Sequence, residues 1–157
     1  MKKIIFLLIS CLSIHELACA DSKIEINAVN NRVAQIEKNK NSFNTLQLKL
    51  NTGEFESSPP EVTYYYKPDN LELVMLQVSV GHEIFVTQYS YYFNNKYLIK
   101  YLKEMLHHPD SPAKQAVIFN SDETILWKNI DEPVVSGASV KALFKSNMDS
   151  LKAFSKY

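Results

Sequence analysis

The strongest constraint on the fold is a series of short strand-like segments that fills the middle of the chain. Each segment is rich in β-branched, aromatic or alternating apolar residues, and each is separated from the next by a turn or loop sequence. The segments cover residues 43–50, 61–67, 71–80, 83–93, 115–120 and 124–130. Consecutive strands joined by short turns pair antiparallel, so this region is expected to form a meander of about five to six strands.

Both ends of this region carry the spacing of amphipathic helices. At the N-terminal side, Ser22 and Glu25 have the spacing of a capping box. At the C-terminal side, Ser139 is a candidate cap after the Ser136-Gly137 break. The apolar residues that recur at steps of three and four are Ile26, Val29, Val33 and Ile36 in the first helix, and Val140, Leu143, Phe144, Met148, Leu151 and Phe154 in the second.

Clustered strands with helices at the two ends predict an α+β domain, in which the helices pack on one face of an antiparallel sheet. The chain has 157 residues. After an N-terminal leader is removed, the remaining residues 21–157 are enough for a single domain with its own core.

The segment 96–107 permits two interpretations. Equal spacing of Leu71, Leu98 and Ile125 after three polar turns favours a hairpin that turns at Asn94-Asn95. The apolar positions Leu98, Leu102, Met105 and Leu106 recur instead at helical steps, with lysines largely on another side. Because the helical pattern covers more residues, the sequence favours a short helix from Lys96 to about His107, ended by Pro109.

The first twenty residues have the features of a secretory signal peptide. Lys2 and Lys3 precede an apolar run over residues 4–14, and Ala18-Cys19-Ala20 places small residues before a cleavage site. The run is too short to span a bilayer, which takes about 20 apolar residues. We therefore expect cleavage after Ala20 and a periplasmic protein without a membrane segment. Lipidation of Cys19 is the minor alternative, because Glu16 stands where a lipoprotein signal has an aliphatic residue.

Cysteine use and charge exclude several classes of function. The only two cysteines, Cys11 and Cys19, both precede the expected cleavage site, so the mature chain would hold no disulfide and no catalytic thiol. The chain has 17 basic and 17 acidic residues. This balance lacks the one-signed field with which proteins bind nucleic acid or anionic lipid.

Motifs for catalysis or cofactors are weak. His82-Glu83, His107-His108 and Asp110 lack the spacing that places two metal ligands on one face, and we expect no metal or cofactor. The serines have no Gly-x-Ser-x-Gly elbow around them. Paired carboxylates for glycan hydrolysis would have to come from Glu54, Glu56, Glu61, Glu72 and Glu83, which we interpret as solvated surface and loop residues.

Tyrosines are concentrated in 61-EVTYYYK-67 and 87-TQYSYYF-93. Neighbouring residues of a strand point to opposite faces, so an open sheet face would display about half of these rings. Tyr suits half-buried strand positions in general. It is also enriched at the hot spots of protein interfaces. Tyr65, Tyr89 and Tyr91 are therefore the candidate protein-binding residues, although their faces depend on the strand register.

These features favour a non-catalytic periplasmic binding module over an enzyme. Its partner would be a protein of the cell envelope, and an inhibitor or immunity protein acting on an envelope-targeting hydrolase is the most concrete version. One alternative is a small enzyme that acts on cell-wall glycan through acidic residues. Another is an accessory protein for envelope assembly or structure. One domain of this size cannot form the two lobes that close on a ligand in soluble substrate-binding proteins.

Overall fold

A computed structural model describes residues 22–50, 59–81, 85–106 and 114–154. The expected signal peptide, both cysteines and the four histidines lie outside these ranges. The described chain begins with a helix over residues 22–38 and a short 3-10 helix, η1 (Lys40–Ser42). The strands and the last helix are β1 (Asn44–Lys49), β2 (Glu61–Tyr66), β3 (Leu73–Gly81), β4 (Val86–Asn94), β5 (Tyr97–Leu106), β6 (Gln115–Phe119), β7 (Ile125–Lys128) and α2 (Gly137–Phe154).

The strands form one seven-stranded sheet in which spatial order follows chain order from β1 to β7. Every neighbouring pair is antiparallel. The expected α+β fold and its meander are confirmed, with somewhat more strands than predicted. Among the described residues, neither helix is both long and apolar enough to cross a membrane.

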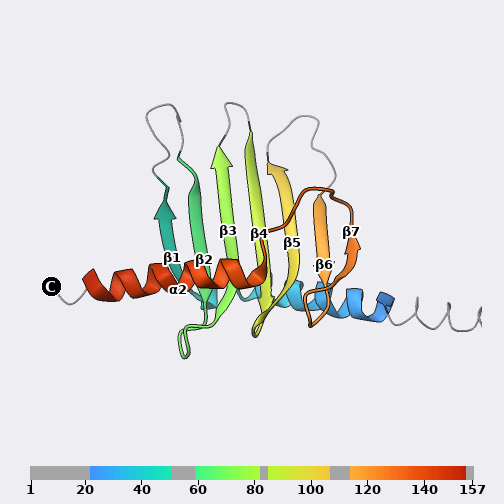
Figure 1. The fold of residues 1–157 in the computed structure, drawn as a ribbon, viewed down its shortest axis with the longest axis horizontal. Helices are drawn as coiled ribbons and strands as arrows, with labels where there is room; N and C mark the ends of the chain where they lie inside the picture. Colours follow the sequence, from blue (N-terminus) through green and yellow to red (C-terminus); the bar gives the residue numbers. More distant parts are fainter. Residues whose placement is uncertain (1–21, 51–58, 82–84, 107–113, 155–157) are drawn as a thin grey trace, which may run out of the picture.

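The two helices lie on opposite faces of the sheet, so the prediction that they share one face is wrong (Figure 1). Helix α2 packs through Val140 and Phe144 on a core that includes Tyr64 and Tyr91. The N-terminal helix packs through Val33 and Ile36 on a second core, made on the other face by the residues Val74, Met75, Tyr92 and Ile99. We call these faces the α2 face and the N-helix face. A sheet covered on both faces needs apolar residues at successive strand positions, not at alternate ones.

Three turns at one end of the sheet share a local geometry. Leu71, Asn95 and Glu123 each adopt a positive φ in these turns, at 56°, 54° and 65°. After each turn the register shifts by one residue, which indicates a β-bulge in β3, β5 and β7. The equal spacing seen in the sequence therefore corresponds to one hairpin design repeated along the meander. We call this end of the sheet the turn end.

The predicted short helix over 96–107 is wrong, because Tyr97–Leu106 form strand β5. Its helical spacing arises because the strand is covered on both faces: Leu98 contributes to the core under α2, whereas Leu102 packs against the core under the N-terminal helix. Asn94 and Tyr97 pair across the turn, as the hairpin alternative required.

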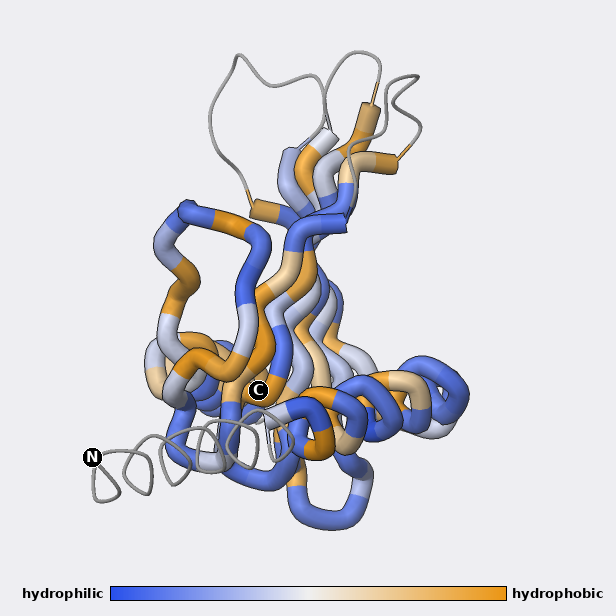
Figure 2. Tube along the Cα trace, turned by 90° about the vertical axis from the view of Figure 1, so that its right-hand side faces the viewer, coloured by the Kyte–Doolittle hydropathy of each residue, from blue (hydrophilic) through white to orange (hydrophobic). Residues whose placement is uncertain are grey.

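Helix α2 begins at Gly137, two residues before the expected cap Ser139. Ser136, not Ser139, supplies the cap, because the Ser139 N–H donates to Ser136 Oγ at 3.2 Å. Both helices flank the half of the sheet nearer the turn end, and the strands extend beyond them toward the opposite end (Figure 2). This arrangement leaves part of the N-helix face uncovered by either helix.

A groove beside the N-terminal helix

The three candidate tyrosines do not share a surface. Tyr91 is only 9% exposed and belongs to the core under α2, where its ring centroid lies 5.0 Å from that of Tyr101. Tyr65 and Tyr89 are both half-buried, but on opposite faces. Tyr65 packs on the N-helix face and Tyr89 on the α2 face. One flat partner surface could therefore contact either Tyr65 or Tyr89, but not both.

Tyr89 is held within the α2 face by its neighbours. Its ring stacks on Tyr101 with a centroid distance of 6.5 Å, and the ammonium of Lys103 lies 5.9 Å from its ring centre. Lys103 is in turn paired with Glu132 at 2.6 Å, in the segment that leads to α2. These contacts account for the Tyr89 ring as part of the packing between the sheet and that segment.

An open groove of about 820 Å³ lies on the N-helix face. One wall is the side of the N-terminal helix, and the other includes β6 and Trp127 of β7. The floor combines apolar side chains with the amides of Gln77 and Gln88. The helix residues on its wall are Ile26, Asn30, Val33 and Glu37. Their spacing of three and four residues shows that one stripe of this helix faces the groove.

A β-bulge explains how a lysine comes to line this groove. Tyr92 pairs with Lys100 and Phe93 with Leu98, so Ile99 is the extra residue of β5. Ile99 and Lys100 then both lie on the N-helix face, instead of alternating. The Lys100 ammonium donates a hydrogen bond to Asn30 Oδ1 of the N-terminal helix at 2.9 Å. Without the bulge, Lys100 would point into the core under α2.

The carboxylates and the lysines that line the groove differ in their partners. The carboxylates have donors within the chain: Glu37 accepts a 2.7 Å hydrogen bond from the Tyr92 hydroxyl, and Glu104 pairs with Lys114 at 2.7 Å. Burial raises the pKa of Tyr92, and Glu37 adds to this rise, so the phenol stays protonated as the donor.

Within the described ranges, the groups that bind Lys40 and Lys100 are neutral. Lys40 donates to Gln77 Oε1 at 3.3 Å and lies 4.8 Å above the ring of Tyr65, whereas Lys100 donates to Asn30. Among the described residues neither lysine has a carboxylate within ion-pair distance. Burial lowers the pKa of Lys100, and nearby Lys114 adds to the effect, which Glu104 opposes.

A second, smaller groove of about 370 Å³ lies on the other side of the same helix, toward the turn end. It is lined by Arg32 and by the turn residues Asn94, Tyr97 and Asn120. The buried Nε of Arg32 has no hydrogen-bond partner in the described part of the protein. Cationic side chains therefore line the grooves on both sides of the N-terminal helix, with Arg32 of the helix itself in the smaller groove and three lysines in the larger one.

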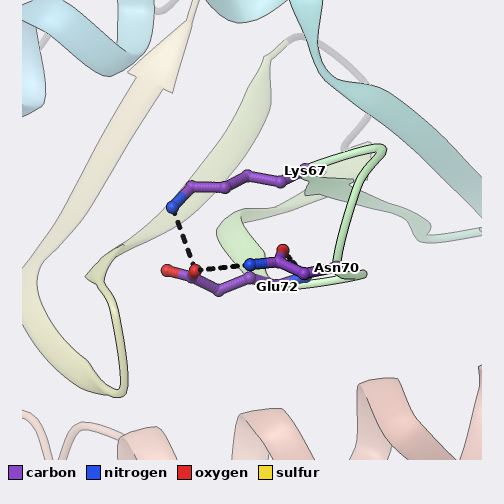
Figure 3. Close-up of polar contacts among 3 residues, drawn as sticks. All are labelled: Lys67, Asn70 and Glu72. Carbon is purple, nitrogen blue, oxygen red and sulfur yellow. Dashed lines mark hydrogen bonds and ion pairs between the residues drawn. The ribbon is translucent and has the colours of Figure 1, made fainter.

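Two of the carboxylates considered for glycan hydrolysis lie far apart and are bound within the chain. Glu72 lies in the turn between β2 and β3, where it accepts from Lys67 Nζ at 2.9 Å and from Asn70 Nδ2 at 3.4 Å (Figure 3). Glu61 begins β2 and pairs with Lys49 at 3.1 Å. Because Glu61 lies opposite Ser79, the two carboxylates are separated by roughly 20 Å along the strands. Glycosidases hold their two carboxyl groups within about 10 Å.

The other sequence candidates for chemistry fall mostly outside the described residues. Glu54, Glu56, Glu83, His82, His107, His108 and Asp110 are in this group. Within the described ranges, no three potential ligands from His, Cys, Asp and Glu come together as a metal site.

Sequence reasoning missed the groove residues. Lys100 and Trp127 belong to segments whose helical or strand character the sequence suggested, but neither position carries a motif. Only the register, the bulge and the placement of the N-terminal helix bring them together. No protein-family model, no curated protein and no solved structure matches this chain.

Proposed function

We propose that the chain is an exported, non-catalytic module that binds a protein in the periplasm. The observation that carries this proposal is the open groove on the N-helix face, in which an exposed Trp127 and apolar floor residues are combined with lysines and amides. Protein interfaces are enriched in aromatic anchors, surrounded by polar groups that can form hydrogen bonds. Of the candidate tyrosines, Tyr65 borders this region through its contact with Lys40.

The most concrete form of this function is inhibition of a hydrolase that attacks the cell envelope. The expected signal peptide and the loss of both cysteines on cleavage support export to the periplasm. An inhibitor or immunity protein needs a rigid surface and no reactive group. The described fold supplies such a surface, because the groove lies on a sheet of paired strands and has the packed N-terminal helix as one wall.

The test is capture followed by reconstitution. The exported protein, immobilised and exposed to envelope extract, should retain a protein that binds it again at defined stoichiometry when both are purified. The hydrolase activity of that partner should fall on binding. Failure to form a complex between the purified proteins would refute the proposal. The intact mass of the exported protein should correspond to a chain that begins at Asp21, whereas a lipidated Cys19 would contradict the expected processing.

One observation favours the glycan-acting enzyme as the second candidate. Glu37 and Glu104 line the same groove as Trp127, and an aromatic ring beside two carboxylates is suited to a sugar. Their contacts argue against acid–base work, because Glu104 is paired with Lys114 and Glu37 accepts from Tyr92. A glycosidase acid is instead held in apolar surroundings. If the purified protein cleaves peptidoglycan and Glu104→Gln abolishes the cleavage, the enzyme hypothesis replaces the binding module.

A further inference from the structure

The charges inside the groove are incompletely balanced. Three lysines line it, Lys40, Lys100 and Lys114, against the two carboxylates Glu37 and Glu104. The pair between Lys114 and Glu104 neutralises one cation, whereas Glu37 keeps its negative charge while it accepts from the neutral Tyr92 hydroxyl, so the lining has an excess of one positive charge. Among the described residues, neither Lys40 nor Lys100 has a carboxylate within ion-pair distance, and their direct partners are the amides of Gln77 and Asn30 and the ring of Tyr65.

Partial burial of the charged Lys100 side chain is unfavourable in the free protein. The side chain is half-buried, and Lys114 lies close enough to lower its pKa together with burial. A desolvated cation gains more from a carboxylate than an exposed cation does, because surrounding water no longer screens the interaction. An anionic group that entered the groove would therefore offset a cost that the chain already bears.

The two cations are spaced for a chain segment instead of a single small anion. Lys40 bonds to Gln77 on β3, and Lys100 projects from β5, so two strand spacings of about 4.8 Å each separate their anchor points. One carboxylate cannot bridge roughly 10 Å. The same groove contains Val33 of the helix and Leu102 of the floor, which offer apolar contacts.

We infer that the groove binds an acidic segment of the partner protein, with Lys40 and Lys100 as its two anchoring cations and Leu102 and Trp127 as the apolar contacts. This inference rests on the proposed binding function and specifies the chemistry of the partner. The complementary segment carries at least two carboxylates and an apolar side chain.

The experiment uses the single tryptophan of the chain as its reporter. Trp127 lines the groove and is 43% exposed, so a bound peptide should change its fluorescence. The probe is a synthetic twelve-residue peptide of glutamate and leucine, titrated into the exported protein at low salt. A peptide with glutamine in place of every glutamate is the matched negative probe. Free glutamate at the same carboxylate concentration tests whether a small anion suffices.

The expected result is saturable binding of the acidic peptide, weakened by added salt and absent for the glutamine peptide. The double variant Lys40→Gln with Lys100→Gln should bind about tenfold more weakly or worse, because hydrogen bonds to charged groups contribute strongly. The double variant Lys40→Arg with Lys100→Arg should retain binding. The control variant Lys96→Gln with Lys145→Gln changes the net charge equally outside the groove and should bind like wild type.

Equal binding of the glutamine peptide, or equal loss in the control variant, would overturn the inference, since neither depends on the two groove cations. Saturation by free glutamate at the same affinity would overturn it as well, and would indicate a small-anion site. These outcomes are separable from failure of the proposed function. If envelope capture yields a partner whose affinity is unchanged by the Lys40 and Lys100 substitutions, the binding module stands and the groove assignment falls.

Discussion

Replacement of Gly137 by alanine tests how tightly α2 is seated on the sheet. A Cβ at this position would lie 2.5 Å from Glu123 Oε1 and 2.9 Å from Leu98 Cβ. The same Oε1 accepts a 2.9 Å hydrogen bond from the Leu98 N–H. The added methyl group must therefore displace the Glu123 carboxylate and separate it from its donor.

The magnitude follows from two opposing effects. A buried N–H that loses a charged acceptor costs about 1.5–3 kcal/mol. Replacement of glycine by alanine inside a helix gains up to about 1 kcal/mol, and less at a first helical residue such as Gly137. We expect Gly137→Ala to lower the free energy of unfolding by about 1–3 kcal/mol. Urea denaturation followed by circular dichroism measures this change. The control Ala142→Gly, in the exposed part of α2, should cost about 1 kcal/mol through helix propensity alone.

A double-mutant cycle separates the clash from other effects. Glu123→Ala removes both the obstructing oxygen and the acceptor, so Gly137→Ala should cost less in that background than in wild type. The reasoning is refuted if Gly137→Ala leaves stability unchanged or raises it. It is also refuted if the cost is the same with and without Glu123, because the carboxylate would then play no part.

Three further predictions concern aromatic residues. Phe144→Ala should lower the free energy of unfolding by about 3–5 kcal/mol, since the ring is buried, whereas Leu143→Ala, at 56% exposure on the same helix, should change it by about 0.5 kcal/mol or less in urea titrations. Burial, followed by the nearby tyrosines, raises the pKa of Tyr101, so the unfolded state loses this proton first and stability should fall as pH rises above about 10. Tyr101→Phe should make that fall shallower in denaturation curves between pH 8 and 11. Tyr65→Ala should weaken the partner complex by about 2 kcal/mol with the fold intact, whereas Tyr89→Ala, on the opposite face, should leave affinity unchanged in calorimetry.

Most of the secondary structure could be predicted from the sequence because local signals agreed with the final fold. The segments 115–120 and 124–130, separated by a turn sequence, correspond to β6 and β7, and the apolar stripe of Val33 and Ile36 identified the first helix and the side that packs. The strand β5 could not be predicted in the same way. Its apolar residues serve both faces, and a bulge at Ile99 breaks the alternation, so the pattern imitated a helix.

The faces of the tyrosines and the composition of the groove required the register. Tyr64 and Tyr65 are neighbours in sequence, yet one is 1% exposed under α2 and the other faces the N-terminal helix. A high aromatic content favours strands and interfaces, but it does not show which ring packs in which of the two cores. Phe154 was predicted to be a core residue, but its side chain is not among those that the structure describes.

The coverage of both faces also explains why a groove exists at all. Helices on one face would have left the other face open as a flat surface, where Tyr65 could act as a platform residue. Instead, each face has one helix over the half near the turn end (Figures 1 and 2). The uncovered part of the N-helix face then forms a groove with the N-terminal helix as its wall. The bulge that directs Lys100 to this wall is the same register shift that hides the strand from sequence analysis. A variant of β5 without the extra residue, made by deleting Ile99, should therefore lose the Lys100 contact with Asn30 together with peptide binding. If the deletion variant folds and still binds the acidic peptide, the bulge is not what places the anchoring cation.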